Sequence, residues 1–243
     1  MGYNLLFFTV ATGRYKIYIT PYIFCALYNN PNARAEIMTD NSIDYKQKSL
    51  ALPILEKQFP ERFLIREIPK GIEPHTARFV CEPITKLEYT YINDVDIMIL
   101  ESNLVETHTG IMAAKQSIFS NRMRGTHKLT GCQFVKTAQY YKMTARARAT
   151  TKLKDEHALY DIVNRGIGRP QIWTSELRPI HGFHLSPNRE PIPAPGLAGW
   201  KMGPEPLRLL YRVMIQSRKW QEIQPYFDRE YNDLLKTLNG YVK

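Results

Sequence analysis

The chain of 243 residues is 44% hydrophobic and 23% charged, a globular composition that excludes a disordered or collagen-like chain. Its net charge of +10 favours an anionic partner, which can be nucleic acid, an anionic membrane surface or a substrate that carries phosphate. The three cysteines have no metal-binding or redox spacing, so we expect reduced thiols and not a disulfide framework.

The first residues, 1–11, have no basic region and only a short apolar run. We therefore expect neither a signal peptide nor a membrane span at this end of the chain. The expected location is the cytoplasm, and any contact with the inner face of a membrane would be peripheral.

The first 100 residues alternate between strand-like and helix-like patterns. Such alternation predicts an α/β fold with a mostly parallel central sheet and helices on both faces. Pro53 predicts a kink or a late start in the second helix. We expect strands over 4–11, 35–39, 63–68 and 89–100, and helices over 15–28, 45–59 and 75–84.

The pattern changes after residue 101. We expect a helix within 104–119, a polar loop over 121–127, a strand over 131–135 and a helix over 155–163. Residues 170–206 are rich in proline and lack periodicity, which is typical of a functional or mobile segment. Helical periodicity returns over 206–238, so we expect one domain over 1–205 and a helical extension over 206–243 packed on it.

Two acids stand out in the strand expected over 89–100, namely Asp94 and Asp96. Their i, i+2 spacing places both side chains on one face of a regular strand. Burying them is costly unless a divalent cation neutralises them, and the alternative is a strand end that faces water. Thr12 and Asp40 also follow strands, and ligands of parallel sheets bind at that edge.

Five segments, in order, resemble the nucleotide-sugar glycosyltransferases with the GT-A fold. The likeness is greatest to the retaining group that includes glycogenin and the lipopolysaccharide galactosyltransferases, and it covers about residues 4–190. The sequence departs from the family pattern in two places. Thr130 stands where the family has Asn, and residues 186–189 stand where it has Lys-Pro-Trp. The segments are 9–12 with Tyr15, 75–80, 91–100, 129–135 with 155–159, and 179–185.

The resemblance implies a metal-dependent enzyme that moves a sugar from a UDP-sugar or GDP-sugar to a glycan or lipid-linked acceptor, with retention. Residues 1–101 would bind the nucleotide sugar and residues 102–205 the acceptor. Asp96 would be a direct metal ligand, and Asp94 a second ligand or a ribose partner. His181 or His184 would complete the site, with His181 favoured by alignment, and an imidazole favours Mn²⁺ over Mg²⁺.

The resemblance also implies further site residues. Asp155, Glu156 and Gln133 would act on the sugar. Competing roles remain for several of these side chains: core packing for Tyr15, an ion pair with Glu82 for Arg78, and helix-start charge for Asp155 and Glu156. The residues expected to bind the donor are Thr9, Ala11, Thr12, Tyr15, Asp40, Arg78, Asp94, Gly131 and Arg189.

The basic residues have two candidate functions, which are steering an anionic donor and contacting an anionic membrane. More commonly, such residues only form a solvated face of a protein. Because they are spread along the chain without a nucleic-acid-binding signature, we expect no nucleic-acid partner. A nuclease-like protein and a non-catalytic interaction module remain the alternatives. The residues concerned are Arg146, Arg148, Lys152, Lys154, Arg208, Arg212, Arg218 and Lys219, with Trp220, Tyr226 and Phe227.

Overall fold

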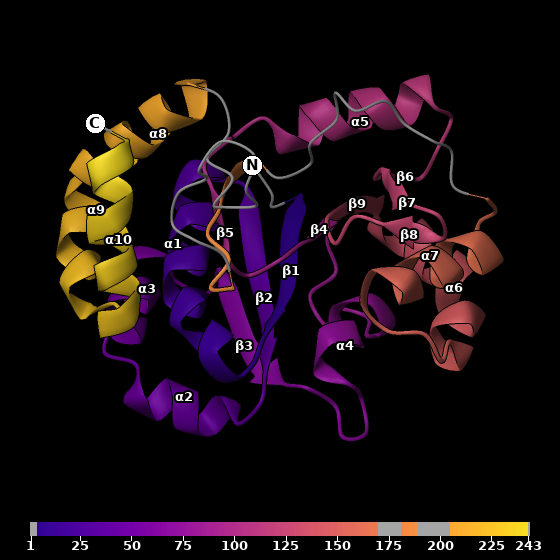
Figure 1. Cartoon of the computed structure of the whole chain (residues 1–243), viewed down its shortest axis with the longest axis horizontal. Helices are drawn as coiled ribbons and strands as arrows, with labels where there is room; N and C mark the ends of the chain where they lie inside the picture. Colours follow the sequence, from indigo (N-terminus) through magenta and orange to yellow (C-terminus); the bar gives the residue numbers. More distant parts are fainter. Residues whose placement is uncertain (1–3, 170–180, 189–204, 243) are drawn as a thin grey trace.

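The computed structural model describes residues 4–169, 181–188 and 205–242 (Figure 1). In this part of the chain the central sheet has the strand order β3–β2–β1–β4–β9–β6. Strands β3, β2, β1 and β4 run parallel, β9 is antiparallel to β4, and β6 is antiparallel to β9. The strands are β1 Leu5–Ala11, β2 Ala33–Thr39, β3 Phe63–Glu67, β4 Tyr89–Ile92, β6 Phe119–Ser120 and β9 Gln133–Lys136.

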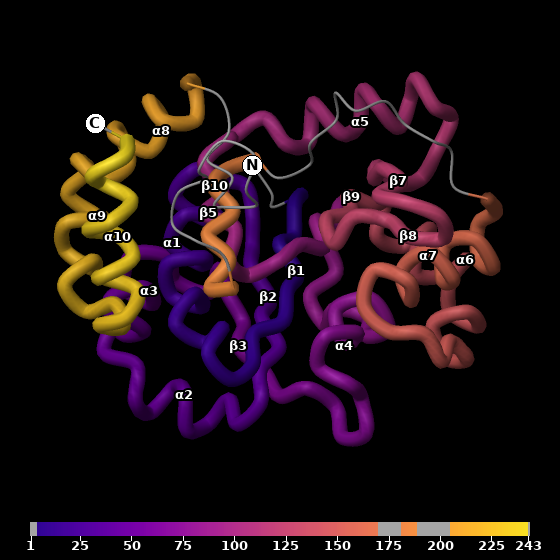
Figure 2. The backbone as a smooth tube through the Cα atoms, viewed as in Figure 1, coloured from indigo at the N-terminus to yellow at the C-terminus, as the bar shows by residue number. Residues whose placement is uncertain are grey.

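Alternating side chains of β1 build a hydrophobic core on each face of this sheet. Leu5 and Phe7 pack with α1, α3 and the C-terminal helices, whereas Leu6 and Phe8 pack with α4, α6 and α7. Figures 1 and 2 show these two groups of helices on opposite sides of the sheet. The predicted α/β fold, with a mostly parallel sheet and helices on both faces, is confirmed. The helices are α1 Ile19–Asn29, α3 Leu52–Gln58, α4 Pro74–Val80, α6 Thr137–Thr150 and α7 Asp155–Gly166.

One helical prediction needs correction, and one helix was not predicted. The single helix expected over 45–59 is two helices, α2 Ser42–Lys48 and α3, because Pro53 occupies the first turn of α3, where its missing N–H costs nothing. Helix α6, for whose residues no element was predicted, buries Tyr140 and Tyr141 against the sheet. The helix expected within 104–119 is α5 Leu104–Ala114.

The long strand expected over 89–100 was wrong. Strand β4 ends at Ile92, the chain turns through 93–96, and β5 Ile97–Ile99 belongs to a separate ribbon. Its partner in that ribbon is the antiparallel strand β10 Gly182–His184. Asp94 and Asp96 therefore lie in a turn and not on the face of a regular strand. Likewise, the loop expected over 121–127 contains β7 Met123–Gly125, which pairs with β8 Lys128–Leu129.

The C-terminal helices pack on α1 and α3. Trp220 lies edge-on against Phe24, and Tyr231 lies edge-on against Tyr18. Trp220 and Phe227 are only 4% exposed, so these two aromatics cannot serve the membrane contact considered for this region. None of the helices in the described ranges is long and apolar enough to cross a membrane. The C-terminal helices are α8 Glu205–Gln216, α9 Arg218–Ile223 and α10 Arg229–Tyr241, with the short η2 Gln224–Tyr226 between the last two.

Candidate functional site

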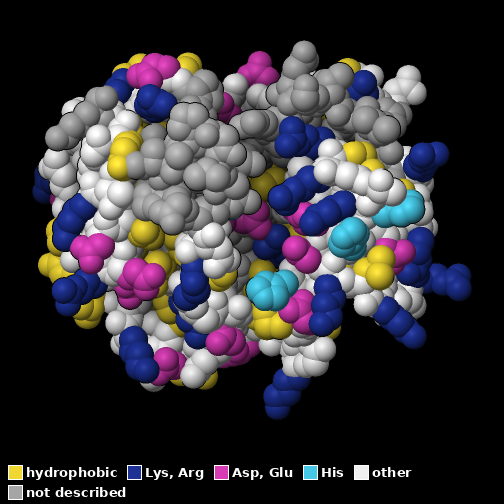
Figure 3. All heavy atoms as spheres, viewed as in Figure 1, with side chains coloured by type: hydrophobic (Ala, Val, Ile, Leu, Met, Phe, Trp, Pro, Cys, Tyr) yellow, Lys and Arg dark blue, Asp and Glu magenta, His cyan; other side chains and the backbone are white. Residues whose placement is uncertain are grey.

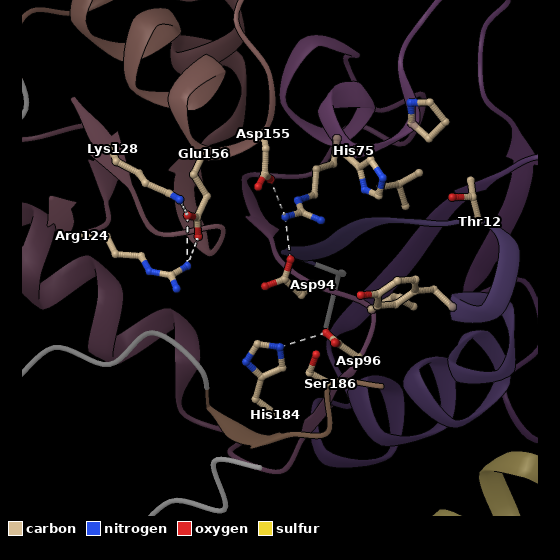
Figure 4. A pocket seen from close by; sticks show the side chains of 15 residues that line it. Thr12, His75, Asp94, Asp96, Arg124, Lys128, Asp155, Glu156, His184 and Ser186 are labelled. Atoms are coloured by element: carbon tan, nitrogen blue, oxygen red, sulfur yellow. Dashed lines mark hydrogen bonds and ion pairs between the residues drawn. The ribbon is translucent and has the colours of Figure 1, made fainter. Parts of the chain in front are cut away.

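A pocket of about 270 Å³ opens where β1 and β4 end, at the carboxyl edge of the parallel strands. Figure 3 shows acidic, basic and histidine side chains gathered close together on this face of the molecule. Figure 4 shows the side chains that line the pocket, which come from both halves of the sequence. The pocket is therefore mainly polar and charged, and Val10, Pro74 and Val95 are the aliphatic residues of its lining.

Asp94, Asp96 and His184 form a cluster in this pocket that could hold a metal ion. One ligand atom from each lies within 4.8 Å of the other two, and His184 Nε2 is 3.2 Å from Asp96 Oδ1 (Figure 4). Asp96 is buried, whereas the other two side chains are half-buried and reach the pocket. Two carboxylates and an imidazole are a donor set that suits a divalent metal ion.

Buried hydrogen bonds hold the turn that carries the two acids. The Thr9 hydroxyl donates to the carbonyl oxygen of Asn93 over 2.7 Å. The Tyr22 hydroxyl donates to the side-chain oxygen of Asn93 over 2.6 Å. Because Asn93 is fully buried and fixed from two elements, the next residue, Asp94, is delivered to the pocket at a defined place.

The other side of the cluster is held by the chain that follows β10. The backbone N–H of Leu185 donates to the carbonyl oxygen of Asp96 over 2.8 Å. The Tyr18 hydroxyl donates to the carbonyl oxygen of Leu185 over 2.7 Å. These two bonds join the segment after His184 to the acid turn and to η1 Gly13–Tyr18, so His184 is placed opposite Asp96.

Arg78, on α4, supports the acid turn from inside. Its Nη2 lies 2.6 Å from Asp94 Oδ1 and 3.8 Å from Asp155 Oδ1. Burial alone would raise the pKa of Asp94, but the charges of Arg78, His184 and Arg124, with Arg78 the strongest of the three, together hold that pKa below its usual range. Burial raises the pKa of Asp155, an effect that Arg78 opposes and Glu156 reinforces. The alternative ion pair of Arg78 with Glu82 is not formed, because Glu82 pairs with Lys86 and Arg148.

Glu156, at the start of α7, is neutralised by two cations of the β7–β8 hairpin. Its carboxylate lies 2.8 Å from Arg124 Nη1 and 3.0 Å from Lys128 Nζ, and it accepts the backbone N–H of Gly131 over 3.1 Å. Gly131 has to be small here, because a Cβ at this position would lie 3.0 Å from the Arg78 guanidinium. The hairpin and the helix thus form one wall of the pocket.

Tyr15 and Thr12 line the opposite end of the pocket. The Tyr15 hydroxyl accepts a hydrogen bond from Asn188 Nδ2 over 2.9 Å, and its ring is half-buried. Burial, and next the charge of Asp96, raise the pKa of Tyr15. An aromatic ring and a hydroxyl therefore lie in the same pocket as the two acids.

The structure brings together eight of the predicted site residues, with Gly131 immediately behind them. Arg189 lies outside the described residues. The eight that line the pocket are Thr12, Tyr15, Arg78, Asp94, Asp96, Asp155, Glu156 and His184.

Besides Gly131, five described residues of the predicted site do not line the pocket. Thr9 and Gln133 are fully buried, and Gln133 accepts a hydrogen bond from Asn121 over 3.1 Å. Ala11 is buried at the end of β1, and Asp40 pairs with Lys16 on the surface. His181, the imidazole favoured by alignment, is turned away from Asp96, because its ring nitrogens contact His108 and Glu101.

Sequence reasoning missed four polar side chains that line the pocket: His75, Arg124, Lys128 and Ser186. Among the basic residues considered for steering an anionic donor, Arg148 donates instead to the carbonyl oxygens of Val80 and Tyr141. The available signal was the pair Arg124 and Lys128, which lie on either side of a turn shortly before Gly131.

No protein-family model and no curated protein matches this chain. Among solved structures, it is similar to a 4-diphosphocytidyl-2C-methyl-D-erythritol synthase from Anaerococcus prevotii, with a TM-score of 0.47, 10% identity, and coverage of 71% of this chain and 87% of the other. It is also similar to the galactosyltransferase LgtC, with a TM-score of 0.42, 10% identity, and coverage of 67% and 70%.

A third similar structure is the glycosyltransferase GlyE of Streptococcus pneumoniae, with a TM-score of 0.44 and 9% identity. The match covers 68% of this chain but only 43% of GlyE, so this chain spans less than half of that protein's length. At these levels of likeness, the function of this chain has to be inferred from its own residues.

Proposed function

We propose that this chain is a metal-dependent glycosyltransferase of the GT-A type that uses a nucleoside diphosphate sugar. The observation that carries the proposal is the convergence of Asp94, Asp96 and His184 within 4.8 Å at the carboxyl edge of the parallel strands. Such an edge is where α/β proteins bind their ligands. The family resemblance of the sequence points to the same residues, with His184 in place of His181.

The charges of the pocket fit a diphosphate bound with a divalent ion. Its lining has four carboxylates and the three permanent cations Arg78, Arg124 and Lys128. The pocket is therefore slightly negative until a divalent cation joins it, and slightly positive afterwards. When bound, the ion would act as a Lewis acid that neutralises the leaving diphosphate. Asp94, Asp96 and His184 would hold it, and Mn²⁺ suits this donor set better than Mg²⁺.

The other side chains of the pocket would contact different parts of the donor. Tyr15 and Thr12 would bind the nucleoside, and stacking on Tyr15 would contribute about 1–3 kcal/mol, as for bases bound by aromatic residues in nucleic-acid complexes. Arg78 keeps Asp94 ionised at neutral pH. Asp155, whose side chain is 53% exposed, is free to accept a hydrogen bond from a sugar hydroxyl and to stabilise positive charge that develops on the ring.

The finer assignments follow from the family resemblance. The donor is a UDP-sugar, with a GDP-sugar as the alternative, and the acceptor is a glycan or a lipid-linked glycan. The reaction proceeds with retention, and an NMR spectrum of the first product anomer tests this point, since an inverted anomer contradicts it. A cytoplasmic location with peripheral contact to an anionic membrane belongs to the same proposal.

A turnover assay tests the proposal. The protein is incubated with a panel of UDP-sugars and GDP-sugars, with and without Mn²⁺, and release of the nucleoside diphosphate is measured. We expect slow, Mn²⁺-dependent hydrolysis of one donor, which also names the sugar. Asp96→Ala should abolish it. Asp233→Ala, which removes an exposed carboxylate paired with Lys236 on α10, is the matched control and should not.

Other outcomes of the same experiment contradict the proposal. Tight binding of single-stranded DNA that weakens steeply with salt, without turnover of any donor, would indicate a nucleic-acid-binding protein. Release of pyrophosphate from a nucleoside triphosphate would indicate nucleotidyl transfer. Donor binding without turnover in the presence of glycan acceptors would indicate a non-catalytic module.

A further inference from the structure

A chain of four polar side chains lies behind the pocket and lines no part of it. His108 Nδ1 is 2.7 Å from the Ser120 hydroxyl, and His108 Nε2 is 2.7 Å from His181 Nε2. His181 Nδ1 in turn contacts a carboxylate oxygen of Glu101. Ser120 and His108 are fully buried, His181 is 5% exposed, and only the carboxylate at the end of the chain reaches the surface.

Every ring nitrogen of both histidines has a partner in this arrangement. Because the ionised Glu101 only accepts, His181 Nδ1 carries the proton of that bond. Between the two Nε2 atoms one donates and the other accepts, and Ser120 can take either role toward His108. The His108 ring also stacks on Phe134, with centroids 4.6 Å apart, so the two rings are fixed in orientation as well as in hydrogen bonding.

The chain joins four elements at the point where β10 begins. Glu101 follows β5, His108 lies on α5, Ser120 lies on β6, and His181 immediately precedes β10. The carbonyl oxygen of His181 accepts the backbone N–H groups of Leu100, over 2.9 Å, and of Glu101, over 3.2 Å. His181 itself has a φ of +55°, a left-handed conformation that non-glycine residues adopt only where their surroundings impose it.

The ribbon that carries His184 is too short to define its own register, which therefore depends on contacts at its two ends. β10 and β5 pair over only three residues each, with His184 opposite Ile97. A slip of one residue would turn His184 to the opposite face, away from Asp96. At the other end, Gly182 passes so close to β5 that a Cβ there would lie 1.8 Å from the carbonyl oxygen of Met98. The anchored His181 before β10, together with the bonds of Leu185 after it, therefore determines where His184 lies.

We propose that Glu101, His181 and His108 are positioning residues, which fix the start of β10 so that His184 faces Asp94 and Asp96. This inference rests on the proposed function, since it takes those three side chains as the holders of a divalent cation. His181, which alignment favoured as the metal ligand, would then have a structural role instead. His181 supports the site from behind through the backbone, without touching the ion or the substrate.

The test measures Mn²⁺ binding in the presence of UDP by the electron paramagnetic resonance signal of free Mn²⁺. Supporting residues around metal sites typically contribute 10–100-fold in affinity, so we expect His181→Ala and Glu101→Ala to weaken Mn²⁺ binding about tenfold. Glu101→Gln keeps an oxygen that can accept from Nδ1 and should stay close to wild type. Leu235→Ala, a buried truncation on α10, controls for a general loss of stability and should bind Mn²⁺ normally.

A second readout uses the metal-free protein and separates the two proposals. We expect amide hydrogen exchange of β10 to be faster in His181→Ala than in Leu235→Ala. If the wild type binds Mn²⁺ no better than Asp96→Ala does, the proposed function fails. If the wild type binds Mn²⁺ and both His181→Ala and Glu101→Ala match it within twofold, or if β10 exchange is unchanged, the positioning role is overturned.

Discussion

The ion pair between Arg78 and Asp94 gives the sharpest prediction about the stability of the pocket. The guanidinium lies 2.6 Å from the carboxylate, with side chains 10% and 26% exposed. Removing one partner of a fully buried pair costs roughly 3–5 kcal/mol, because the other charge is left without a partner. Since Asp94 is partly solvated, we expect Arg78→Met to lower the free energy of unfolding by about 2–3 kcal/mol.

The assay is a double-mutant cycle in urea at pH 7 with Arg78→Met, Asp94→Asn and both together. The double variant should be more stable than the sum of the single changes predicts, by about 1–2 kcal/mol, because the unpaired charge is gone. Mn²⁺ with UDP should restore part of the loss in Arg78→Met, since a bound ion neutralises Asp94. Additivity within about 0.5 kcal/mol would refute this account of the pair.

The effect of pH on this pair has a definite sign. Arg78 holds the pKa of Asp94 below its usual range, so the stabilisation is present at neutral pH and is lost only as pH falls through that lowered pKa. In Arg78→Met the pKa of Asp94 rises, so Asp94 is protonated at a higher pH than in the wild type. The difference in stability between wild type and variant should therefore narrow as the pH is lowered from 7 toward 4.

Three further predictions concern the surroundings of the pocket. Gly182→Ala should weaken Mn²⁺ binding and destabilise β10, as read by hydrogen exchange, because its Cβ would overlap the carbonyl oxygen of Met98; wild-type binding would contradict this. Burial, and next the charge of His181, hold the pKa of His108 well below its ordinary value, so only the unfolded chain binds that proton below about pH 6.5. The free energy of unfolding should then decrease by up to about 1.4 kcal/mol for each unit by which the pH is lowered. His108→Gln should reduce that slope in urea titrations, and an unchanged slope would contradict this role of His108. Trp220→Ala should cost about 3–5 kcal/mol by thermal melting yet leave vesicle binding unchanged, whereas weaker vesicle binding by the folded variant would return this aromatic to a membrane role.

The parts of the fold that the sequence predicted correctly are those with local signals. The continuous apolar run of β1 and the strand–helix alternation up to residue 84 follow from periodicity, and Asn30 with Pro31 ends α1 where expected. Pro53 was recognised as a break, although not as the start of a new helix. The apolar run over 89–100 misled because nothing local reveals the bonds from Thr9 and Tyr22 that turn the chain at Asn93.

The site was predictable where it depends on residue type and not where it depends on tertiary placement. Residue type and spacing were enough to single out Asp94 and Asp96 as candidate cation ligands, with a water-facing strand end as the alternative, and the two acids lie in one cluster with His184. The choice between His181 and His184 depends on His108 and Glu101, which lie 73 and 80 residues away from His181 in the chain and take its ring nitrogens. Arg124 and Lys128 contact Glu156 because the β7–β8 hairpin packs against α7. The residues of this hairpin are mostly polar and lack strand periodicity, so the sequence predicted a loop.

The most direct test of the metal-dependent nucleotide site is calorimetric titration of UDP into the protein, with and without Mn²⁺. We predict binding that requires Mn²⁺ in the wild type and in the control Asp233→Ala, that is lost in Asp96→Ala, and that is clearly weakened in His184→Ala. UDP binding of equal strength without the metal, or binding that survives in Asp96→Ala, would contradict the assignment of Asp94, Asp96 and His184 as the metal site.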